Sequence, residues 1–264
     1  MSLLDVPIVK YADEKVFRIH DQVPVEEPLE IFINDEPFHM TMRLPGEEVA
    51  LALGFCFTEG IIDGLNDTLS VNYCQDVSSN RMMVYLHPTR AEFVSEKLRQ
   101  KRTTSYSSCG VCGKEVVADL CSTLEKARNR VQMGLSKLLE LQQTTEGSQK
   151  IFRATGGTHA AAIFSVQGEL MALSEDIGRH NALDKAIGKV LLGKAAGEAG
   201  VLILTSRLSY EMVQKAARLG LEIVAGASAP TSLAISLAES VNVTLVGFLR
   251  HDGGNVYSGA QRIS

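Results

Sequence analysis

The last third of the chain alternates apolar strands with helices, and this alternation constrains the fold more than any other feature. Residues 201–205, 222–225 and 243–248 are short apolar runs, typical of strands covered on both faces of a sheet. Residues 209–219 and 230–240, between them, have helical patterns. Strand–helix–strand units at this spacing predict parallel strands joined by right-handed crossovers. Ligands on such a sheet bind beyond the carboxyl ends of its strands.

Upstream of these strands, the sequence predicts a hairpin between helices. Residues 159–166 and 170–173 flank a Gln-Gly-Glu turn, and residues 181–192 have a helical pattern. An earlier apolar pattern begins at Leu135, and polar residues 144–149 predict a break between helices. We therefore expect a three-layer α/β/α domain over residues 132–264.

The first half of the chain has a different character, typical of a smaller α+β domain. Residues 16–20 and 82–86 have strand patterns, and residues 29–44 predict a hairpin around an Asn-Asp turn. Pro45 and two following acidic residues suit the first turn of a helix. We expect this N-terminal domain to cover residues 1–131 and to end in a cysteine-bearing loop and a helix.

Two cysteines three positions apart dominate the chemistry of that loop. Cys109 and Cys112 are each followed by glycine. Such a pair can be a redox couple, half of a metal site or a carrier of reactive sulfur. A structural zinc site needs four ligands, and neither His87 nor Cys121 has convincing spacing to complete one. Zinc is therefore the weakest of the three hypotheses.

The other two hypotheses remain open from the residues alone. A thioredoxin-like pair normally follows a strand, whereas this pair follows the polar residues 103–108. Lys114 and a helix start could nevertheless lower a thiol pKa, which suits a redox couple. A sulfur carrier would hold a persulfide on one thiolate, and a Ser/Gly-rich loop suits movement between a donor and an acceptor.

Composition and charge exclude several classes of protein. The chain of 264 residues has a formal net charge of −5, no tryptophan and no long Lys/Arg block, so nucleic-acid binding is not expected. No window approaches the ~20 apolar residues of a membrane span, and the first residues do not resemble a signal peptide. We therefore expect a cytoplasmic protein. Five cysteines indicate free thiols, with Cys56 and Cys74 as small buried hydrophobic residues.

A polar cluster at residues 175–181 lies at the start of a predicted helix. Arg179 and His180 beside a helix N-terminus would form an anion site. A helix cap with surface ion pairs explains the cluster equally well. Residues 155–159 contain paired glycines that allow close approach of a ligand, although a simple turn is the commoner explanation. Residues 248–253 follow a strand and are ligand candidates by position.

Together these segments resemble the formate dehydrogenase accessory sulfurtransferase family. The matching segments follow one another in order over nearly the whole chain. They are residues 27–29, 45–47, 54–55, 59–60, 108–113, 155–161, 175–185, 205–207, 229–232 and 247–250.

The resemblance implies a function. The protein would accept persulfide sulfur from a cysteine desulfurase and pass it to the molybdenum or tungsten bis-pterin guanine dinucleotide cofactor, which formate dehydrogenase needs. Cys109 would carry the persulfide, with Cys112 as the second catalytic thiol. The cofactor would be bound as a substrate, with no structural metal. The cofactor-binding segment of the family falls on Phe248, Leu249, Arg250, His251, Asp252 and Gly253.

The resemblance also implies a homodimer and a C-terminal domain similar in fold to cytidine deaminases. Deaminases bind zinc with His-x-Glu at one helix start and Cys-x-x-Cys at the next. Here the first helix start has Ala182 in place of the glutamate, and residues 206–212 contain no cysteine. The sequence therefore excludes deaminase chemistry.

The crevice without zinc would be free to bind a nucleotide-like cofactor. We expect four residues to contact its phosphates or guanine, namely Arg179, His180, Ser206 and Arg207. Two alternatives remain: a chaperone that inserts the cofactor without moving sulfur, and a dithiol oxidoreductase.

Overall fold

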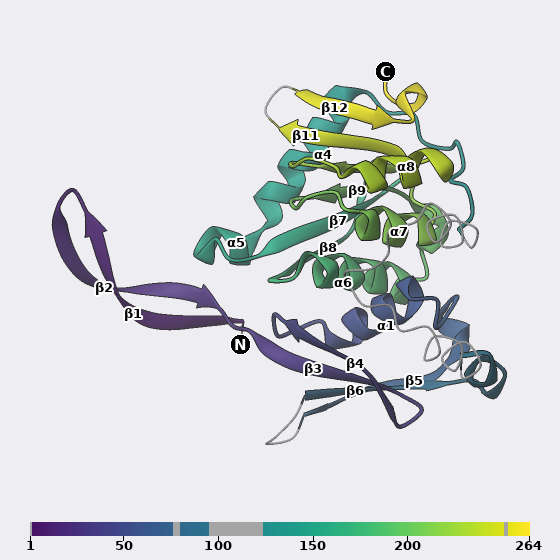
Figure 1. The fold of residues 1–264 in the computed structure, drawn as a ribbon, viewed down its shortest axis with the longest axis horizontal. Coiled ribbons are helices and arrows are strands. Elements are labelled where there is room, and N and C mark those ends of the chain that lie inside the picture. The colour runs from purple at the N-terminus through teal and green to yellow at the C-terminus, as the bar shows by residue number, and fades with distance from the viewer. Residues whose placement is uncertain (1, 76–79, 95–123, 251–252) are drawn as a thin grey trace.

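The computed structural model describes residues 2–75, 80–94, 124–250 and 253–264 (Figure 1). These residues form a six-stranded sheet, a four-stranded sheet and a two-stranded hairpin, with helices packed around the two larger sheets. The predicted cysteine loop, half of the helix predicted over residues 91–98 and most of the helical pattern after residue 114 lie outside the described residues.

The six-stranded sheet forms the C-terminal half of the molecule, in the order β12-β11-β10-β9-β7-β8. Its central strands β9, β10 and β11 run parallel, as the sequence predicts. The remaining pairings are antiparallel, including the predicted β7–β8 hairpin. The strands are β7 His159–Ser165, β8 Leu170–Asp176, β9 Ala199–Leu204, β10 Ile223–Gly226, β11 Thr244–Arg250 and β12 Gly253–Ser258.

Helices cover both faces of this sheet. Helices α6 (Arg179–Leu192), α7 (Tyr210–Arg218) and α8 (Ser232–Ser240) lie on one face, and α4 (Leu135–Ser148) lies on the other (Figure 1). Side chains of a strand alternate between faces. Accordingly, Leu202 packs in the cluster under α6–α8, and Ile203 packs in the cluster under α4. The predicted three-layer α/β/α architecture is confirmed.

The N-terminal sheet has the order β4-β3-β6-β5 and packs against helix α1 (Glu48–Thr58). Its strands are β3 Glu27–Ile33, β4 Glu36–Arg43, β5 Thr68–Gln75 and β6 Asn80–Leu86. The hairpin and the helix predicted after Pro45 are confirmed. Short 3-10 turns complete the fold at Leu65–Asp67, Ala196–Glu198 and Ala260–Arg262.

Helices α1 and α6 join the two halves at very short range. A Cβ atom added to Gly54 would lie 1.8 Å from the backbone oxygen of Asp184, and one added to Gly188 would lie 1.9 Å from that of Ala50. Glycine at both points lets the two backbones touch. The main hydrophobic cluster accordingly runs through both halves, and the division near residue 131 stays a prediction.

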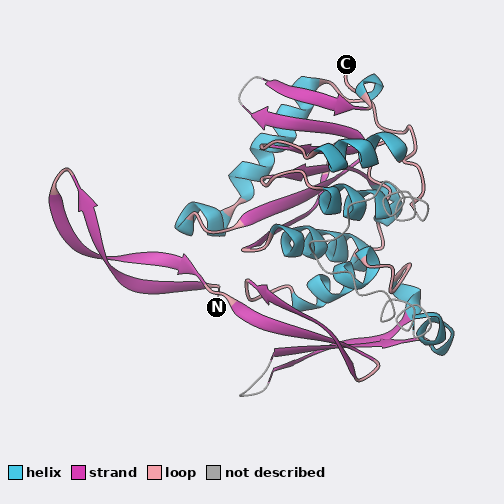
Figure 2. Ribbon diagram, viewed as in Figure 1, coloured by secondary structure: helices cyan, strands magenta, loops and turns pink. Residues whose placement is uncertain are grey.

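The first two strands form an arm that the sequence predicts only in part. Strands β1 (Leu3–Ala12) and β2 (Lys15–Pro24) pair only with each other among the described residues and project from the molecule (Figures 1 and 2). Residues 16–20 are part of β2, as predicted, but β1 is not predicted. Its turn uses Asp13 and Glu14 at φ 48° and 60°, without the glycine or asparagine that usually marks such a turn.

Other differences from the sequence predictions are local. Residues 144–148 continue α4 as helix, and the break falls at Gln149, before α5 (Lys150–Thr155). Strand β8 is three residues longer than predicted, and strands β5 and β12 are not predicted. None of the helices within the described ranges is long and apolar enough to cross a membrane.

Candidate functional site

The carboxyl ends of the parallel strands meet at one edge of the large sheet. The amide of Ala227 donates to the oxygen of Leu204, and the amide of Phe248 donates to the oxygen of Ser228, both at 3.2 Å. Strand β7 runs antiparallel to β9, so its first residue, His159, lies at the same edge. The predicted ligand segments are therefore neighbours in space.

A cavity of about 600 Å³ opens at this edge. Its walls come from α4, α5, the start of β7 and the turns after β9 and β10, and they include Phe152, Gly157, His159, Thr205 and Ala227. The volume lies within the ~300–1,000 Å³ of typical ligand sites. This cavity is the best candidate for a small-molecule site among the described residues because it coincides with the strand ends.

The cavity wall also contains polar side chains with spare hydrogen-bonding capacity. Gln142 and Gln149 are 2% and 3% exposed. The Oε1 atom of Gln142 and the Nε2 atom of Gln149 have no hydrogen-bond partner among the described residues. Buried polar groups are nearly always paired. A polar ligand or water that enters the cavity can supply the missing partners.

Three basic side chains converge beside the cavity. Burial lowers the pKa of His159 from its ordinary value, and the nearby cations Arg179 and Arg207 lower it further. His159 is therefore a neutral imidazole at neutral pH, flanked by two guanidinium groups. Arg179 and Arg207, predicted from separate motifs, are thus both close enough to act on His159, and their charge suits an anionic ligand.

Arg179 and His180, the first residues of α6, have different surroundings. The Nε atom of Arg179 is buried and has no hydrogen-bond partner within the described part of the chain. His180 Nε2 pairs with a carboxylate oxygen of Glu211 in the first turn of α7. Arg179 therefore has a free donor at the helix N-terminus, whereas His180 is already engaged.

The two acidic residues before α6 have structural roles. Glu175 accepts hydrogen bonds from the amides of Ile151 at 2.9 Å and Phe152 at 2.7 Å, and from the hydroxyl of Thr158 at 3.0 Å. Its carboxylate thus caps α5 and fixes the glycine turn that follows.

The second acidic residue, Asp176, is fully buried. It forms a 2.7 Å ion pair with Lys185, whose ammonium group also donates to the oxygen of Leu44 at 2.8 Å. The amide of Leu44 in turn donates to Asp176 at 3.2 Å. This pair therefore joins the N-terminal half of the chain to the large domain.

The rest of the cluster also joins the two halves. The side-chain nitrogen of Asn181 donates to the oxygen of Met42 at 2.8 Å. Asp184 accepts hydrogen bonds from Thr58 at 2.9 Å and from Lys215 at 2.8 Å. Residues 175–185 are thus mostly structural, and Arg179, whose charge acts on His159 in the cavity wall, is the member connected to the candidate site.

The predicted cofactor segment forms the end of β11 and the start of β12. Phe248 is 37% exposed and has φ 53°, which bends the strand, and Arg250 is exposed. Leu249 is 0% exposed and its side chain packs in the cluster under α4. Gly253 opens β12 and is half-buried. His251 and Asp252 lie outside the described residues.

Ser206 and Arg207, two of the predicted contact residues, differ in exposure. The side chain of Ser206 is 3% exposed, and its hydroxyl donates to the oxygen of Arg207 at 3.3 Å. Arg207 itself is exposed. Of the two residues, Arg207 is the one free to meet a ligand.

Sequence reasoning gave little weight to residues 155–159, which form part of the cavity wall. Gly156 has φ 69°, a conformation that favours glycine. A Cβ atom on Gly157 would lie 2.7 Å from the ring of Pro24 in the arm. The paired glycines are a weak signal in the sequence, but in the structure they mark a turn whose backbone conformation and close contact with the arm both favour glycine.

The thiols predicted as catalytic, Cys109 and Cys112, lie outside the described residues, as does Cys121. Cys56 is fully buried, as predicted, and burial raises the pKa of its thiol to about 12. Cys74 is exposed, so the prediction of a buried residue is wrong there. Within the described ranges, no group of three or more His, Cys, Asp or Glu side chains is positioned to hold a metal ion.

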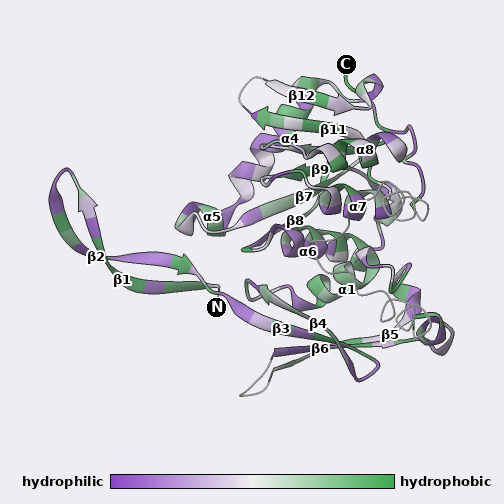
Figure 3. Ribbon diagram, in the orientation of Figure 1, coloured by the Kyte–Doolittle hydropathy of each residue, from purple (hydrophilic) through white to green (hydrophobic). Residues whose placement is uncertain are grey.

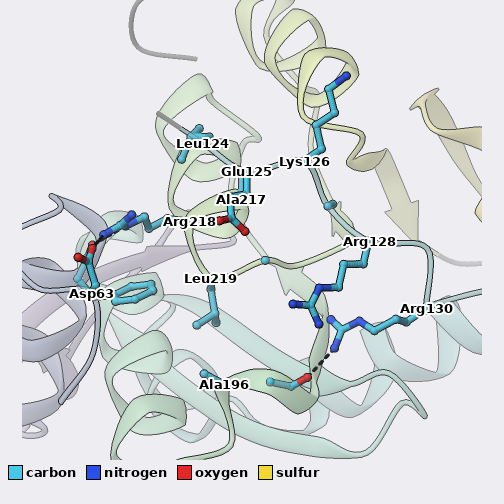
Figure 4. A pocket seen from close by; sticks show the side chains of 14 residues that line it. Asp63, Leu124, Glu125, Lys126, Arg128, Arg130, Ala196, Ala217, Arg218 and Leu219 are labelled. Atoms are coloured by element: carbon cyan, nitrogen blue, oxygen red, sulfur yellow. Dashed lines mark hydrogen bonds and ion pairs between the residues drawn. The ribbon is translucent and has the colours of Figure 1, made fainter. Parts of the chain in front are cut away.

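A second cavity, of about 540 Å³, lies at the opposite edge of the sheet (Figure 4). Ala196 and Leu219, which precede β9 and β10, line it together with Leu124. Arg218, also in its wall, pairs with Asp63, to which Arg90 donates at 2.7 Å. The described residues just before and just after the segment 95–123 therefore lie near the amino ends of the strands. The first cavity lies at the other edge of the sheet.

The fold and its cavity define a three-layer α/β/α protein with a ligand-sized site at the carboxyl ends of parallel strands. A model of the FdhD/NarQ family matches residues 24–264. The chain therefore belongs to the FdhD/NarQ family, which confirms the resemblance found in the sequence.

Individual relatives match along the whole chain. A protein from Nocardia farcinica named sulfur carrier protein FdhD is 39% identical over 261 residues, 97% of this chain and 93% of its own. One of the same name from Sulfolobus acidocaldarius is 37% identical over 264 residues, covering 100% and 99%. The crystal structure of a formate dehydrogenase accessory protein from Desulfotalea psychrophila matches with a TM-score of 0.79 at 25% identity and covers 100% of both chains.

Proposed function

We propose that this protein is a sulfurtransferase that serves formate dehydrogenase. It accepts persulfide sulfur from a cysteine desulfurase on Cys109 and transfers that sulfur to a molybdenum or tungsten bis-pterin guanine dinucleotide cofactor. The observation that carries the proposal is the match to relatives named sulfur carriers over 97–100% of the chain. Such chemistry suits a reducing compartment, so the cytoplasm remains our expected location.

The choice of thiol rests on exclusion and on sequence. The thiolate is the nucleophile in persulfide exchange, and a thiol with a pKa of about 12 is almost wholly protonated at pH 7. Cys56 is therefore unsuited to the role. The paired cysteines Cys109 and Cys112, in the motif that resembles the family, are the best candidates. Cys109 attacks the outer sulfur of the donor persulfide, and the donor leaves as a thiolate.

The cavity at the carboxyl edge is our candidate site for the cofactor. Arg179 and Arg207 supply positive charge for its phosphate groups, and neutral His159 can donate or accept a hydrogen bond there. Phe248 and Arg250 lie at the end of β11, three strand positions from β7 in the same sheet. At ~4.8 Å per strand this is ~14 Å, a span suited to an extended dinucleotide.

Chain length allows Cys109 to approach either edge of the sheet. It lies fifteen residues from Leu124 and fifteen from Val94. Fifteen residues extend to at most ~54 Å, at 3.3–3.6 Å per residue. The sheet is about 20 Å deep, from six-residue strands such as β9. Chain length is therefore compatible with sulfur transfer from Cys109 to a cofactor at the carboxyl edge.

A cofactor-insertion chaperone without sulfur transfer also fits the cavity, and one experiment separates it from a sulfurtransferase. Cells that lack this protein would be complemented with wild type, with Cys109→Ala/Cys112→Ala or with the control Cys74→Ala, which changes an exposed thiol. We expect formate dehydrogenase activity only with wild type and the control. Full activity with the double variant would refute the sulfurtransferase and support the chaperone.

A further inference from the structure

The C-terminal half of α4 presents a row of polar side chains to the cavity at the carboxyl edge. Gln142, Glu146 and Gln149 all line this cavity. Their spacing of four and three residues places them on one face of the helix. Figure 3 shows hydrophilic residues along this part of α4, whereas strand β7 is largely apolar. A few polar groups in the wall of a ligand-sized cavity fix the orientation and identity of what binds there.

Gln142 presents an unused hydrogen-bond acceptor. Its side chain is 2% exposed, and its Nε2 atom donates to a carboxylate oxygen of Glu146 at 2.8 Å. Because an ionised carboxylate only accepts hydrogen bonds, this contact determines which end of the amide is the nitrogen. The free end is therefore Oε1, which has no partner among the described residues. A buried acceptor without a partner is unfavourable, and a donor group on a ligand would satisfy it.

Gln149 provides the complementary group, an unused donor. Its side chain is 3% exposed, and its Nε2 atom has no partner in the described part of the chain. The backbone is held in place, since Gln149 ends α4 and its oxygen accepts a hydrogen bond from Arg153 Nε at 3.2 Å. The amide of Gln142 leans toward Glu146, one helical turn nearer to Gln149. One planar ligand can therefore meet both free atoms.

We propose that Gln142, Glu146 and Gln149 read the guanine base of the bound nucleotide. The Watson–Crick edge of guanine has two adjacent N–H donors, at N2 and N1, followed by the O6 acceptor. Gln142 Oε1 and the Glu146 carboxylate accept from the two donors, and Gln149 Nε2 donates to O6. Adenine places its N1 acceptor and its amino donor at this edge. Its acceptor would face acceptors and its donor would face a donor, so the site rejects it.

Phe152 supplies a surface on which the base can stack. It is 43% exposed although it is aromatic, and it lines the cavity from the first turn of α5. Aromatic rings stack on every nucleobase and do not select among them. Arg179 and Arg207, whose charges act on His159, remain available for the phosphate groups. The end of α4 and the start of α5 thus hold the base, and the arginines hold the phosphates.

The inference rests on the proposed function, which supplies a guanine nucleotide as the ligand, and it adds the residues that select the base. The test is calorimetric binding of three nucleoside diphosphates to the full-length protein. Wild type should bind guanosine diphosphate at least ~10-fold more tightly than inosine diphosphate, which lacks the N2 amino group. It should bind guanosine diphosphate at least ~100-fold more tightly than adenosine diphosphate, because buried polar groups would be left unpaired.

Variants of the two glutamines should reduce this selectivity. Gln142→Met keeps the length of the side chain but has no acceptor oxygen, and Gln149→Met has no donor. Each should bind guanosine diphosphate about 10-fold more weakly or worse and adenosine diphosphate about as wild type does, so the ratio of the two affinities falls. Each variant is tested for folding by its melting temperature.

Two further variants separate base selection from a general loss of binding. Phe152→Leu should weaken guanosine and adenosine diphosphate by the same factor, because stacking does not distinguish the bases. Gln143→Met is the matched control, since Gln143 is the exposed neighbour of Gln142 and does not line the cavity. It should bind all three nucleotides as wild type does.

Equal affinities of wild type for guanosine and adenosine diphosphate would overturn the proposal. A Gln142→Met protein that keeps the wild-type ratio would also overturn it. Neither result bears on sulfur transfer, which is measured separately as reducible sulfur on Cys109. A wild type that binds no guanosine diphosphate would overturn both the base selection and the proposed cofactor site, and would still leave the sulfur assignment to its own test.

Discussion

Gly54 of α1 lies directly against the backbone oxygen of Asp184 in α6, where even a single methyl group would be 1.8 Å from that oxygen. This contact joins the N-terminal helix to the helix that begins at Arg179. The geometry of the candidate site therefore depends on a helix crossing more than one turn away from it.

Substituting Gly54 with alanine should destabilise the fold. The added carbon has no space, so the helices must move apart, and we expect a loss of about 2 kcal/mol or more in the free energy of unfolding. Gly147→Ala, in α4 with nothing within 4 Å of the added carbon, is the matched control. It should stabilise slightly, by up to ~1 kcal/mol. Urea denaturation measures both, and equal stability of the two variants would contradict the close crossing.

Breaking the buried pair of Asp176 and Lys185 should be costly. Both side chains are at most 1% exposed and 2.7 Å apart, so Lys185→Met leaves an unpaired carboxylate in the core. The expected loss is about 3–5 kcal/mol. Lys137→Met removes the exposed partner of Glu140 and should change stability by less than ~1 kcal/mol. Comparable melting temperatures for the two variants would argue against the buried pair.

Stability should fall as the solution becomes acidic, in part through His159. Burial and two arginines lower its pKa in the folded protein below the reference value of 6.5. Above pH 6.5, the His159 side chain is mostly neutral in both the folded and the unfolded protein. As the pH falls below it, the unfolded chain takes up the proton first, and the free energy of unfolding decreases. Between pH 7 and 5, His159→Gln should therefore show a shallower decline than wild type in chemical denaturation. The control His87→Gln, which changes an exposed imidazole, should follow wild type.

Removing Arg207 should weaken binding of a guanine nucleotide. Guanosine diphosphate serves as the probe, since it shares the phosphate and base of the proposed cofactor. Arg207→Gln removes one charge-assisted contact and should raise its dissociation constant about 10-fold or more by calorimetry. Arg128→Gln, on the opposite edge, is the control and should leave affinity unchanged. Equal affinity of Arg207→Gln and wild type would exclude that arginine from the site.

Much of the large domain could be predicted because its sequence pattern matches its structure. The apolar runs at residues 201–205 and 243–248 became parallel strands, since nothing but burial on both faces explains them. Arg207 could be placed at the carboxyl edge, because carboxyl ends of parallel strands meet there. Arg179 could be placed beside it only through the resemblance in fold to cytidine deaminases.

The remaining features of the site could not be predicted, because they depend on contacts that leave no local signal in the sequence. The role of Glu175 as a cap for α5 depends on contacts between segments far apart in sequence, and no local pattern encodes it. The burial of the Leu249 and Ser206 side chains could not be predicted either, because position along the chain does not determine which side chains point into the core. Strand β1 could not be predicted, because the turn that joins it to β2 is formed by Asp13 and Glu14 and lacks the glycine that usually marks a hairpin.

The intact mass of the protein after reaction with a cysteine desulfurase and cysteine tests the central claim most directly. Wild type and Cys74→Ala should each gain one sulfur atom that a thiol reductant removes. Cys109→Ala should gain none, since the proposed carrier is absent. A Cys109→Ala protein that gains the same reducible sulfur as wild type would contradict the assignment.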